Sequence, residues 1–287
     1  MKIPASELPL TPDGRIYHLG IFPEDLADYI IVVGDPGRVP DVSKYFDTVD
    51  FTHVNRELVV HTGTLRGKRI TALSTGMGTD NIDIVMTELD SLANIDLKAM
   101  EVKPEHRTLN IVRIGTCGAL QKEIDVHSFI AAEYGFGLDG LMHFYQHGEG
   151  FDDEMVKAFV AHTGWNEKLP YPYCVKGSSD LFNRIAFDMV KGVTASAPGF
   201  FGPQGRAVRV PLAYPDLNSK IDSFRFGDRK ITNLEMETSA LYGFGQMMGH
   251  NMLTICLAIA NRVTHDFSKD YHPHMEKLIR TVLNRIF

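Results

Sequence analysis

The chain has 287 residues, of which 44% are hydrophobic and 23% are charged, a composition typical of globular proteins rather than of disordered or fibrous ones. Its formal net charge of -7, without any block of lysine and arginine, argues against a nucleic-acid partner. Three widely separated cysteines, no apolar segment near the N-terminus and no stretch approaching the ~18 apolar residues of a membrane span favour a reduced cytoplasmic protein with no membrane partner.

Short apolar segments that end in glycine or polar residues alternate with helix-like segments. In chain order, the expected strands are 30–34, 69–75, 109–115, 127–135, 173–180, 231–237 and 252–262. The expected helices are 38–46, 76–95, 153–165, 184–193, 238–250 and 274–287. In the last of these, apolar residues at 278, 279, 282, 283 and 286 have helical spacing. The alternation predicts an α/β sheet covered on both faces.

Two polar segments, 96–108 and 211–220, are expected to be surface excursions within one domain. The second of them contains two prolines, which favour turns. Since the chain has neither an internal repeat nor a low-complexity linker, we expect a single domain that spans residues 1–287.

Functional groups of open α/β sheets collect beyond the carboxyl ends of the strands, where a rigid scaffold holds the loops. The residues at those ends are Gly34, Asp35, Pro36, Gly37, Arg38, Thr75, Gly76, Met77, Gly78, Arg113, Ile114, Gly115, Thr116, Cys117, Gly118, Ser178, Ser179, Asp180, Glu235, Met236, Glu237, Asn261 and Arg262. Arginines, glutamates and small polar residues together predict a site for an anion beside a polyhydroxyl group.

Two of the arginines stand beside small residues in a way that suits phosphate. A guanidinium presents a planar fork of donors, and glycine lets backbone N–H groups approach an anion closely. Gly34 with Arg38, and Arg113 with Thr116, are two such pairings. The alternatives are that GDPGR is a plain surface turn and that Arg113 forms a structural salt bridge.

The segment NLEMETSA places Glu235 and Glu237 two residues apart. In a strand they would face the same side, where a carboxylate could accept two hydrogen bonds from vicinal hydroxyls. The alternative is a helix N-terminus, which acidic side chains cap naturally.

The segment FFGPQGR combines flat apolar rings with directional polar groups. Gln204 and Arg206 supply donors and an acceptor, and Phe200 and Phe201 supply ring faces. A planar heterocycle with amide-like edges needs that combination, although the spacing alone favours a Gly/Pro loop with packed phenylalanines. No histidine or cysteine spacing matches a transition-metal motif.

The segments VGDPGRV, STGMG, RIGTCGAL, FFGPQGR, NLEMETSA and IANR occur in this order between about His18 and Arg262. Together they resemble the uridine phosphorylase branch of the nucleoside phosphorylase family. The resemblance implies a three-layer α/β/α fold with a mixed central sheet. It also implies reversible phosphorolysis of uridine to uracil and ribose 1-phosphate, a pentosyltransferase reaction of pyrimidine salvage. Inorganic phosphate is then a co-substrate, and no organic cofactor is needed.

The resemblance also assigns roles to residues of this chain. The phosphate-binding set is Gly34, Arg38, Arg56, Arg113 and Thr116; the ribose-binding set is His18, Met236 and Glu237; the base-binding set is Gly118, Phe200, Gln204, Arg206 and Glu235. The catalytic residues are Arg113, Gln204, Arg206 and Arg262, and a monovalent cation such as K⁺ would lie at Glu57, Met77 and Asn81. His18 and Arg56 match residues that reach a neighbouring subunit's site, which implies a homo-oligomer, at least a dimer and commonly a hexamer.

Two other functions fit the same segments. A purine or broad-specificity nucleoside phosphorylase is one, but purine enzymes resemble this chain less because they carry a catalytic aspartate where it reads AIANRVTH; here Arg262 is present and Asp266 comes later. A non-catalytic nucleoside-binding protein is the other. Cys117 stands where threonine or serine is usual, and FFGPQGR has glycine before proline, so the base preference stays open.

Overall fold

Eleven strands form one large mixed sheet in the computed structural model, which describes residues 2–146 and 150–287. The strands are β1 (Tyr29–Val33), β2 (Thr48–Asn55), β3 (Leu58–Leu65), β4 (Lys68–Ser74), β7 (Asn110–Ala119), β8 (Phe129–Gly137), β9 (Tyr173–Lys176), β10 (Val190–Ser196), β11 (Arg225–Phe226), β12 (Arg229–Glu235) and β13 (Asn251–Asn261). Their order is β11-β12-β10-β8-β13-β7-β1-β4-β3-β2, and β9 pairs with β8.

The centre of the sheet is parallel and buried on both faces. β1 lies between β4 and β7, parallel to each, and β13 is parallel to β7. Ile30 and Val32 belong to the hydrophobic core on one face of the sheet, whereas Ile31 and Val33 belong to the core on the other. Because successive side chains of a strand point to opposite faces, a strand covered on both sides needs a continuous apolar run.

Five strands close into a ring at one end of the sheet. β12 pairs in parallel with β10 and antiparallel with β7, through Asn233 opposite Ala119 and Leu234 opposite Gly118. The circle is completed by β10 with β8, β8 with β13, and β13 with β7. The ring brings the end of β12 to the end of β7, although the two are more than 100 residues apart in the chain.

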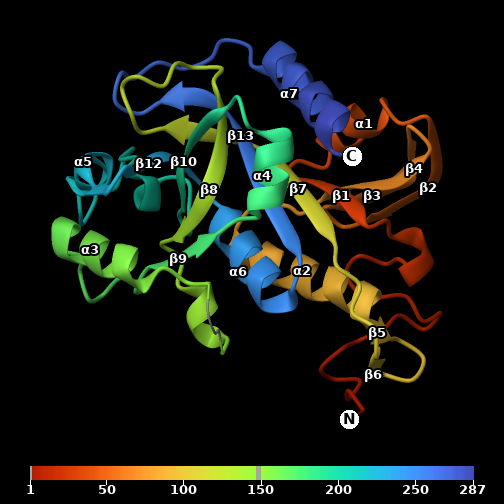
Figure 1. Ribbon diagram of the computed structural model, residues 1–287. Helices are drawn as coiled ribbons and strands as arrows, with labels where there is room; N and C mark the ends of the chain where they lie inside the picture. The colour runs from red at the N-terminus through yellow and green to blue at the C-terminus, as the bar shows by residue number, and fades with distance from the viewer. Residues whose placement is uncertain (1, 147–149) are drawn as a thin grey trace.

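Helices cover both faces of the sheet (Figure 1). α1 (Arg38–Ser43), α4 (Ser179–Ile185) and α7 (His272–Arg285) pack on one face. α2 (Thr79–Asn94) and α6 (Thr238–Met248) pack on the other. α3 (Asp153–Thr163) and α5 (Leu217–Ser223) enclose a third core beside β9 and β12. The three-layer α/β/α fold with a mixed sheet is therefore confirmed.

Several predicted elements differ from the structure. The expected helix 184–193 is wrong, since α4 ends at Ile185 and β10 begins at Val190. The segment 96–108 does leave the sheet, as the small hairpin of β5 (Ile95–Asp96) and β6 (Glu101–Val102), whereas 211–220 contains the start of α5. The antiparallel strands β2 and β3 were not predicted, because β2 is mostly exposed and lacks an apolar run.

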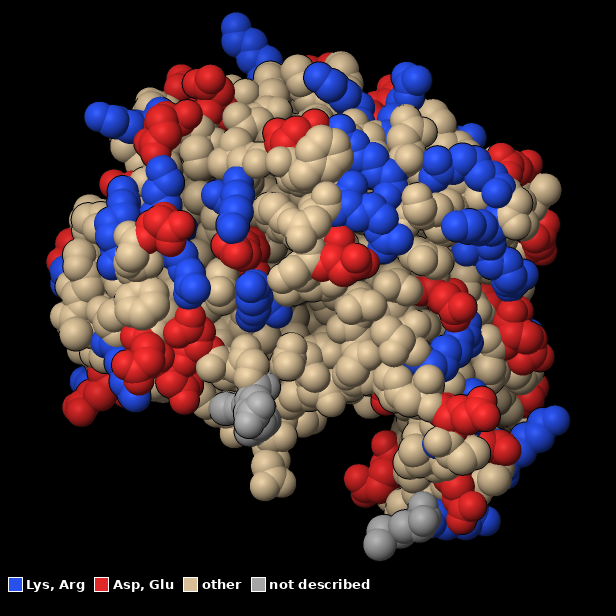
Figure 2. Space-filling model, viewed as in Figure 1, with Lys and Arg blue, Asp and Glu red and all other residues tan. Residues whose placement is uncertain are grey.

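The surface agrees with the mixed charge of the sequence. On the face seen in Figure 2, lysine and arginine side chains are mixed with aspartate and glutamate side chains, and several basic side chains lie next to one another at the upper right. In the described part of the chain, no helix is both long and apolar enough to cross a membrane.

Candidate active site

The ends of β1, β4, β12 and β13 and the middle of β7 surround a cavity of ≈ 620 Å³. Most of the predicted site residues line it: Gly34, Arg38, Glu57, Met77, Asn81, Arg113, Thr116, Gly118, Phe200, Gln204, Arg206, Glu235, Met236 and Glu237. The structure thus brings these residues together from six separate segments, most of them at the carboxyl ends of parallel strands, as open α/β sheets commonly do.

The turn after β1 carries Arg38 into this cavity. Asp35 Oδ1 accepts a hydrogen bond from the Gly37 N–H at 2.9 Å, and the Arg38 N–H donates to the Asp35 carbonyl at 3.0 Å. The chain reverses tightly and α1 begins at Arg38, whose side chain is only 9% exposed. The segment GDPGR is therefore not a plain surface turn, because its arginine is buried against the cavity.

Arg113, on β7, is held by two carboxylates on the cavity floor. Its Nη1 lies 3.0 Å from Oε2 of Glu235, and its Nη2 donates to Oε2 of Glu237. Burial alone would lower the pKa of Arg113, but Glu237 and Glu235 outweigh it and raise the pKa above its ordinary value. Arg113 therefore forms the structural salt bridge that was the alternative interpretation, and it lines the cavity as well.

Glu235 ends β12 and also caps α6. Its carboxylate accepts hydrogen bonds from the N–H groups of Glu237 at 3.0 Å and Thr238 at 3.1 Å. The Ser196 hydroxyl donates to Oε1 at 2.6 Å. The strand and the helix-cap interpretations of NLEMETSA are thus both correct for this residue. With its oxygens engaged in this way, Glu235 positions Arg113 and the start of α6.

Glu237 lies at the junction of three segments. Its Oε1 accepts the Gly78 N–H at 2.8 Å, which ties the loop after β4 to the start of α6. The side chain is 5% exposed, and burial raises its pKa although Arg113 acts in the opposite direction. Two carboxylates against one guanidinium leave this buried cluster with an excess of negative charge.

The opposite end of the cavity is formed by the loop after β10. Gln204 is 3% exposed, and its Oε1 accepts a hydrogen bond from Arg206 Nη1 at 2.7 Å. The Arg206 guanidinium stacks on Phe200, 3.8 Å from the ring centroid. Arg262 Nη2 donates to the Gln204 carbonyl at 3.2 Å. Burial and the nearby Arg262 lower the pKa of Arg206 to about 10.

Two glycines of β7 make room for these arginines. A Cβ on Gly115 would lie 2.3 Å from Arg113 Nη1, and a Cβ on Gly118 would lie 3.2 Å from Arg262 Cγ. Glycine at both positions lets the guanidinium groups pass close to the strand backbone. The glycines of the segment RIGTCG therefore have a steric reason, which is the room that the neighbouring arginine side chains need. The sequence pattern alone did not indicate this reason.

Three predicted site residues do not line the cavity of their own chain: His18, Arg56 and Arg262. Arg262 contacts its rim through Gln204 and Gly118. Arg56 is exposed in the turn between β2 and β3, and its neighbour Glu57 lines the cavity. His18 Nδ1 lies 2.7 Å from Oε1 of Glu88, whose carboxylate also accepts the backbone N–H groups of His18 and Leu19.

The match to a family model decides the relationship of this chain to known proteins. Residues 28–287 match the model of the phosphorylase superfamily. The chain belongs to this superfamily. A uridine phosphorylase of Thermococcus kodakarensis is 28% identical over 277 residues, 93% of this chain and 85% of the relative. A DeoD-type purine nucleoside phosphorylase of Alkaliphilus metalliredigens is 27% identical over 252 residues, 86% of this chain and 88% of that protein.

A solved structure gives the same relationship in three dimensions. It is a nucleoside phosphorylase of Trypanosoma brucei that shows uridine phosphorylase activity. The TM-score is 0.86 at 27% identity, and the superposition covers 97% of this chain and 98% of that one. The family model and the solved structure therefore agree on the superfamily and the fold.

The sequence analysis did not identify Phe267 and Ser196 as residues of the candidate site. Phe267, in the loop after β13, lines the cavity although 72% of it is exposed, and Ser196 lies beneath Glu235. A serine at a strand end is too common to be noticed. An aromatic residue in a polar loop, FSKDY, was the available signal for Phe267.

Cys117 also lines the cavity. Burial raises the pKa of its thiol well above the usual range, and neighbouring Cys256 acts in the same direction. The thiolate is therefore scarce at neutral pH, and a nucleophilic role for Cys117 is disfavoured.

Two groups of side chains offer cation ligands among the described residues. Glu57 and Asn81 meet at one edge of the cavity, with Asn81 Nδ2 3.4 Å from Glu57 Oε1, and Met77 lines the same cavity. Asp90, His106 and His250 lie elsewhere, with ligand atoms within 4.8 Å of one another. His250 Nδ1 accepts the Leu109 N–H at 3.2 Å, so the neutral ring carries its proton on Nε2, toward Asp90. That nitrogen is then not a metal ligand.

Proposed function

We propose that this chain is a uridine phosphorylase, which converts uridine and phosphate into uracil and ribose 1-phosphate and runs in either direction. One observation carries the proposal: a single cavity is lined by Arg38 and Arg113, by Glu237, and by Gln204 with Arg206. An anion, a pair of hydroxyls and an amide-like heterocycle each have matching partners there. The uridine phosphorylase relatives support the same substrate.

Phosphate would bind at the end formed by Gly34, Arg38, Arg113 and Thr116. The Arg113 charge is already shared with Glu235 and Glu237, so it does not by itself compensate a divalent anion. Arg38, which is buried beside the same cavity, supplies one further positive charge. We infer that Arg56 of a second subunit supplies another, since in its own chain it does not line the cavity.

Ribose would lie over Met236 and Glu237. The glycosidic bond breaks as positive charge develops on the sugar ring, and the phosphate beneath C1′ stabilises this charge before it attacks. The Glu237 carboxylate would accept hydrogen bonds from the 2′- and 3′-hydroxyls, which fixes the ring relative to phosphate. His18 of the second subunit would contact the 5′-hydroxyl.

The base end would stabilise the leaving uracil. The electron pair of the broken bond moves onto the pyrimidine, and donors of Gln204 and Arg206 face the position where its oxygens become more negative. Arg262 adds positive charge beside Gln204. Gly118, Phe200 and Glu235 complete the pocket. No covalent intermediate and no organic cofactor enter this scheme, because phosphate itself is the nucleophile.

We further propose that the active protein is a homo-oligomer, a dimer at least and a hexamer in the fully assembled state, working in pyrimidine salvage in the cytoplasm.

We also propose a K⁺ site at the edge of the cavity where the second subunit would bind. The Glu57 and Asn81 side-chain oxygens and the Met77 carbonyl are ligands of the type that K⁺ takes. The test is thermal denaturation in KCl and in N-methylglucamine chloride. A higher midpoint in KCl, lost in Glu57→Gln, is expected; equal midpoints would refute the K⁺ site.

The decisive assay for the reaction is uracil release from uridine, followed by ultraviolet absorbance with and without phosphate, with inosine as the control substrate. Phosphate-dependent release from uridine alone is expected, and Arg38→Ala and Gln204→Ala should each reduce it by roughly two orders of magnitude. Cleavage of inosine would instead favour the purine-type function of the DeoD-type relative. Binding of uridine without cleavage would identify a nucleoside-binding protein.

The position of Asp266, in the segment after β13, argues against the alternative that the chain is a purine nucleoside phosphorylase. Asp266 is exposed, accepts a hydrogen bond from the Thr264 hydroxyl at 2.6 Å and does not line the cavity. The segment after β13 therefore presents Arg262, and not a carboxylate, to the nucleobase. An arginine at this position favours a pyrimidine nucleobase.

A further inference from the structure

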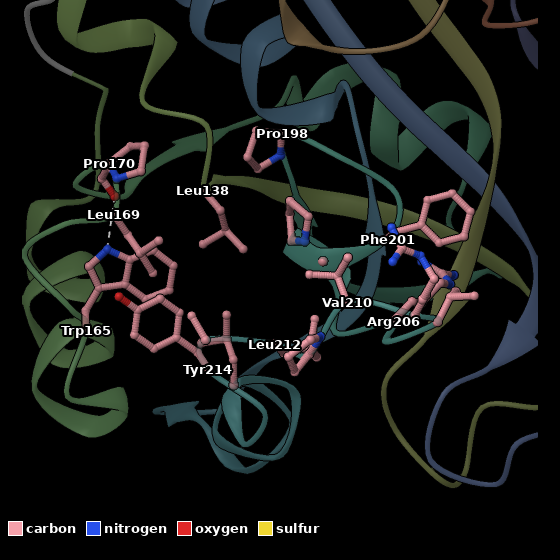
Figure 3. A pocket seen from close by; sticks show the side chains of 17 residues that line it. Leu138, Trp165, Leu169, Pro170, Pro198, Phe201, Arg206, Val210, Leu212 and Tyr214 are labelled. Atoms are coloured by element: carbon pink, nitrogen blue, oxygen red, sulfur yellow. Dashed lines mark hydrogen bonds between the residues drawn. The ribbon is translucent and has the colours of Figure 1, made fainter.

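A second cavity, of ≈ 670 Å³, lies beside the first and shares with it only Arg206. Figure 3 shows its walls: Trp165 and Tyr214 on one side, Leu138 and Pro198 above, and Phe201 and Val210 on the other side. These residues come from the segment after α3, the end of β8 and the long loop between β10 and α5. Its volume lies in the range of small-molecule sites, roughly 300–1,000 Å³.

One wall is fixed without any ligand. The Trp165 indole Nε1 donates to the Pro170 carbonyl at 3.0 Å, and its ring lies 5.6 Å from that of Phe159, centroid to centroid. Leu138 is buried, and its N–H donates to the Ser196 carbonyl at 2.9 Å. The indole face and the leucine are therefore held in place before anything binds, which lowers the entropic cost of binding.

The opposite wall exposes apolar side chains to solvent. Phe201 is 58% exposed, Val208 83% and Val210 67%, all within one loop. A continuous group of exposed apolar side chains around a concave surface marks an interaction site more often than chance exposure does.

The charges at this cavity have a single sign. Arg206 and Arg209 line it, and none of its lining residues is acidic. Arg206 donates to the Phe200 carbonyl at 2.5 Å and to Gln204 Oε1 at 2.7 Å, and no carboxylate pairs with it among the described residues. An anion in this cavity would gain from two guanidinium groups and would meet no opposing carboxylate.

The wall chemistry favours a ring compound over a peptide. A peptide brings backbone N–H and C=O groups that need partners when buried. The indole N–H is already used by Pro170, and the rest of the wall is mainly hydrocarbon and proline. Flat aromatic faces at Trp165, Tyr214 and Phe201 suit a planar hydrocarbon.

We propose that this cavity is a second ligand site, which adjoins the nucleoside site at Arg206 and binds a planar aromatic small molecule that carries one anionic group. The ring lies between Trp165 and the apolar loop, and the anion faces Arg206 and Arg209. This inference does not depend on the reaction proposed above.

Trp165 allows a direct test, because it is the only tryptophan of the chain. The full-length protein is titrated with 1-anilinonaphthalene-8-sulfonate, and energy transfer from Trp165 to the dye is followed. Saturable transfer at one dye per chain is expected. Val210→Glu should weaken binding about tenfold or more, since it places a carboxylate on the apolar wall. The matched control Val54→Glu, at an exposed position of β2, should bind as the wild type does.

A second comparison tests the charge. Arg209→Gln should weaken binding of the anionic dye about tenfold and leave binding of the neutral N-phenyl-1-naphthylamine unchanged. Absence of energy transfer, or equal binding by wild type and Val210→Glu, would overturn the proposal. A lower oligomer mass in Val210→Glu without dye binding to the wild type would overturn it too, and would identify this wall as an interface between copies of the chain. Circular dichroism of each variant establishes that it is folded.

Discussion

Glu237 combines several demands in one buried carboxylate. It accepts hydrogen bonds from Arg113 and from the Gly78 N–H, and the proposed reaction asks it to bind two ribose hydroxyls as well. Replacing it by glutamine keeps the shape but removes the charge that faces Arg113. We expect Glu237→Gln to reduce kcat/KM for uridine by roughly two orders of magnitude, measured by uracil release.

The same variant gives a prediction for stability against pH. Burial raises the pKa of Glu237 above the ordinary 4.5, so the folded chain holds this proton more tightly than the unfolded chain. Its stabilising contribution is complete below pH 4.5 and is lost as pH rises through the raised pKa. The free energy of unfolding of Glu237→Gln minus that of the wild type should therefore grow as the pH rises above 4.5. Urea denaturation across that range measures it, and a flat difference would contradict the assignment.

Ser196 is a positioning residue in this scheme. Its hydroxyl donates to Glu235 and accepts the Ser239 N–H at 2.9 Å, and it is completely buried. Ser196→Ala should lower the free energy of unfolding by about 1–3 kcal/mol, because a buried N–H loses its acceptor. It should also raise KM for phosphate several-fold while KM for uridine changes little, since Glu235 orients Arg113.

The matched control is Ser219→Ala, which removes an exposed hydroxyl bonded only to the Asp216 carbonyl. It should change neither stability nor either KM. Equal effects of Ser196→Ala on the two Michaelis constants would mean that the serine supports the fold and not the phosphate end.

At the level of elements, the hairpin at 96–108 is tied to the rest of the chain by histidines. His250, at the start of β13, accepts the Leu109 N–H and faces Asp90 of α2 at 3.2 Å. His250→Ala should lower the free energy of unfolding by about 1–3 kcal/mol, because the buried Leu109 N–H is left unpaired. His106→Ala, an exposed position next to it, should cost clearly less in the same denaturant titration. Equal losses would show that the buried acceptor is not what matters.

The elements that sequence predicted best are those buried on both faces. β1, β7 and β13 are mostly buried and mostly apolar segments, and length and β-branched residues mark them as strands. β10 was missed because the preceding segment, RIAFDM, has helix-like spacing and Val190 follows it without a glycine or proline break. β2 was missed because it is mostly exposed and lacks an apolar run, and it obtains its structure from pairing with β3. β3 in turn pairs with β4.

The candidate site was predicted better than the elements that hold it. Fourteen of the residues assigned from the resemblance line one cavity, from Gly34 to Glu237. The sequence offered a salt bridge for Arg113 and an acidic helix cap as alternatives, but it could not identify their partners, because these depend on the closure of β12 against β7. Only tertiary structure brings those segments together.

For the whole molecule, the proposed shared site predicts complementation between inactive subunits. Arg38→Ala and Arg56→Ala should each be inactive alone. In the proposed arrangement, Arg38 lies in the active site of its own subunit, and Arg56 reaches into the active site of the neighbouring subunit. Mixed dimers then contain one intact site out of two. After unfolding and refolding of an equal mixture, about one quarter of wild-type activity should return, because half of the dimers are mixed. No recovery would mean that both arginines act within one chain.

The position of β13 has a consequence for how the protein is made. The last strand of the chain lies in the middle of the sheet, between β7 and β8 (Figure 1). Until residue 261 has left the ribosome, β7 and β8 have no partner on their facing edges, and the ring of five strands stays open. Such long-range pairing slows folding and exposes unpaired edges to aggregation. Residues up to 261 must therefore be synthesised before the sheet that holds the cavity is complete, and a truncation before β13 would remove a central strand of the sheet rather than an edge strand.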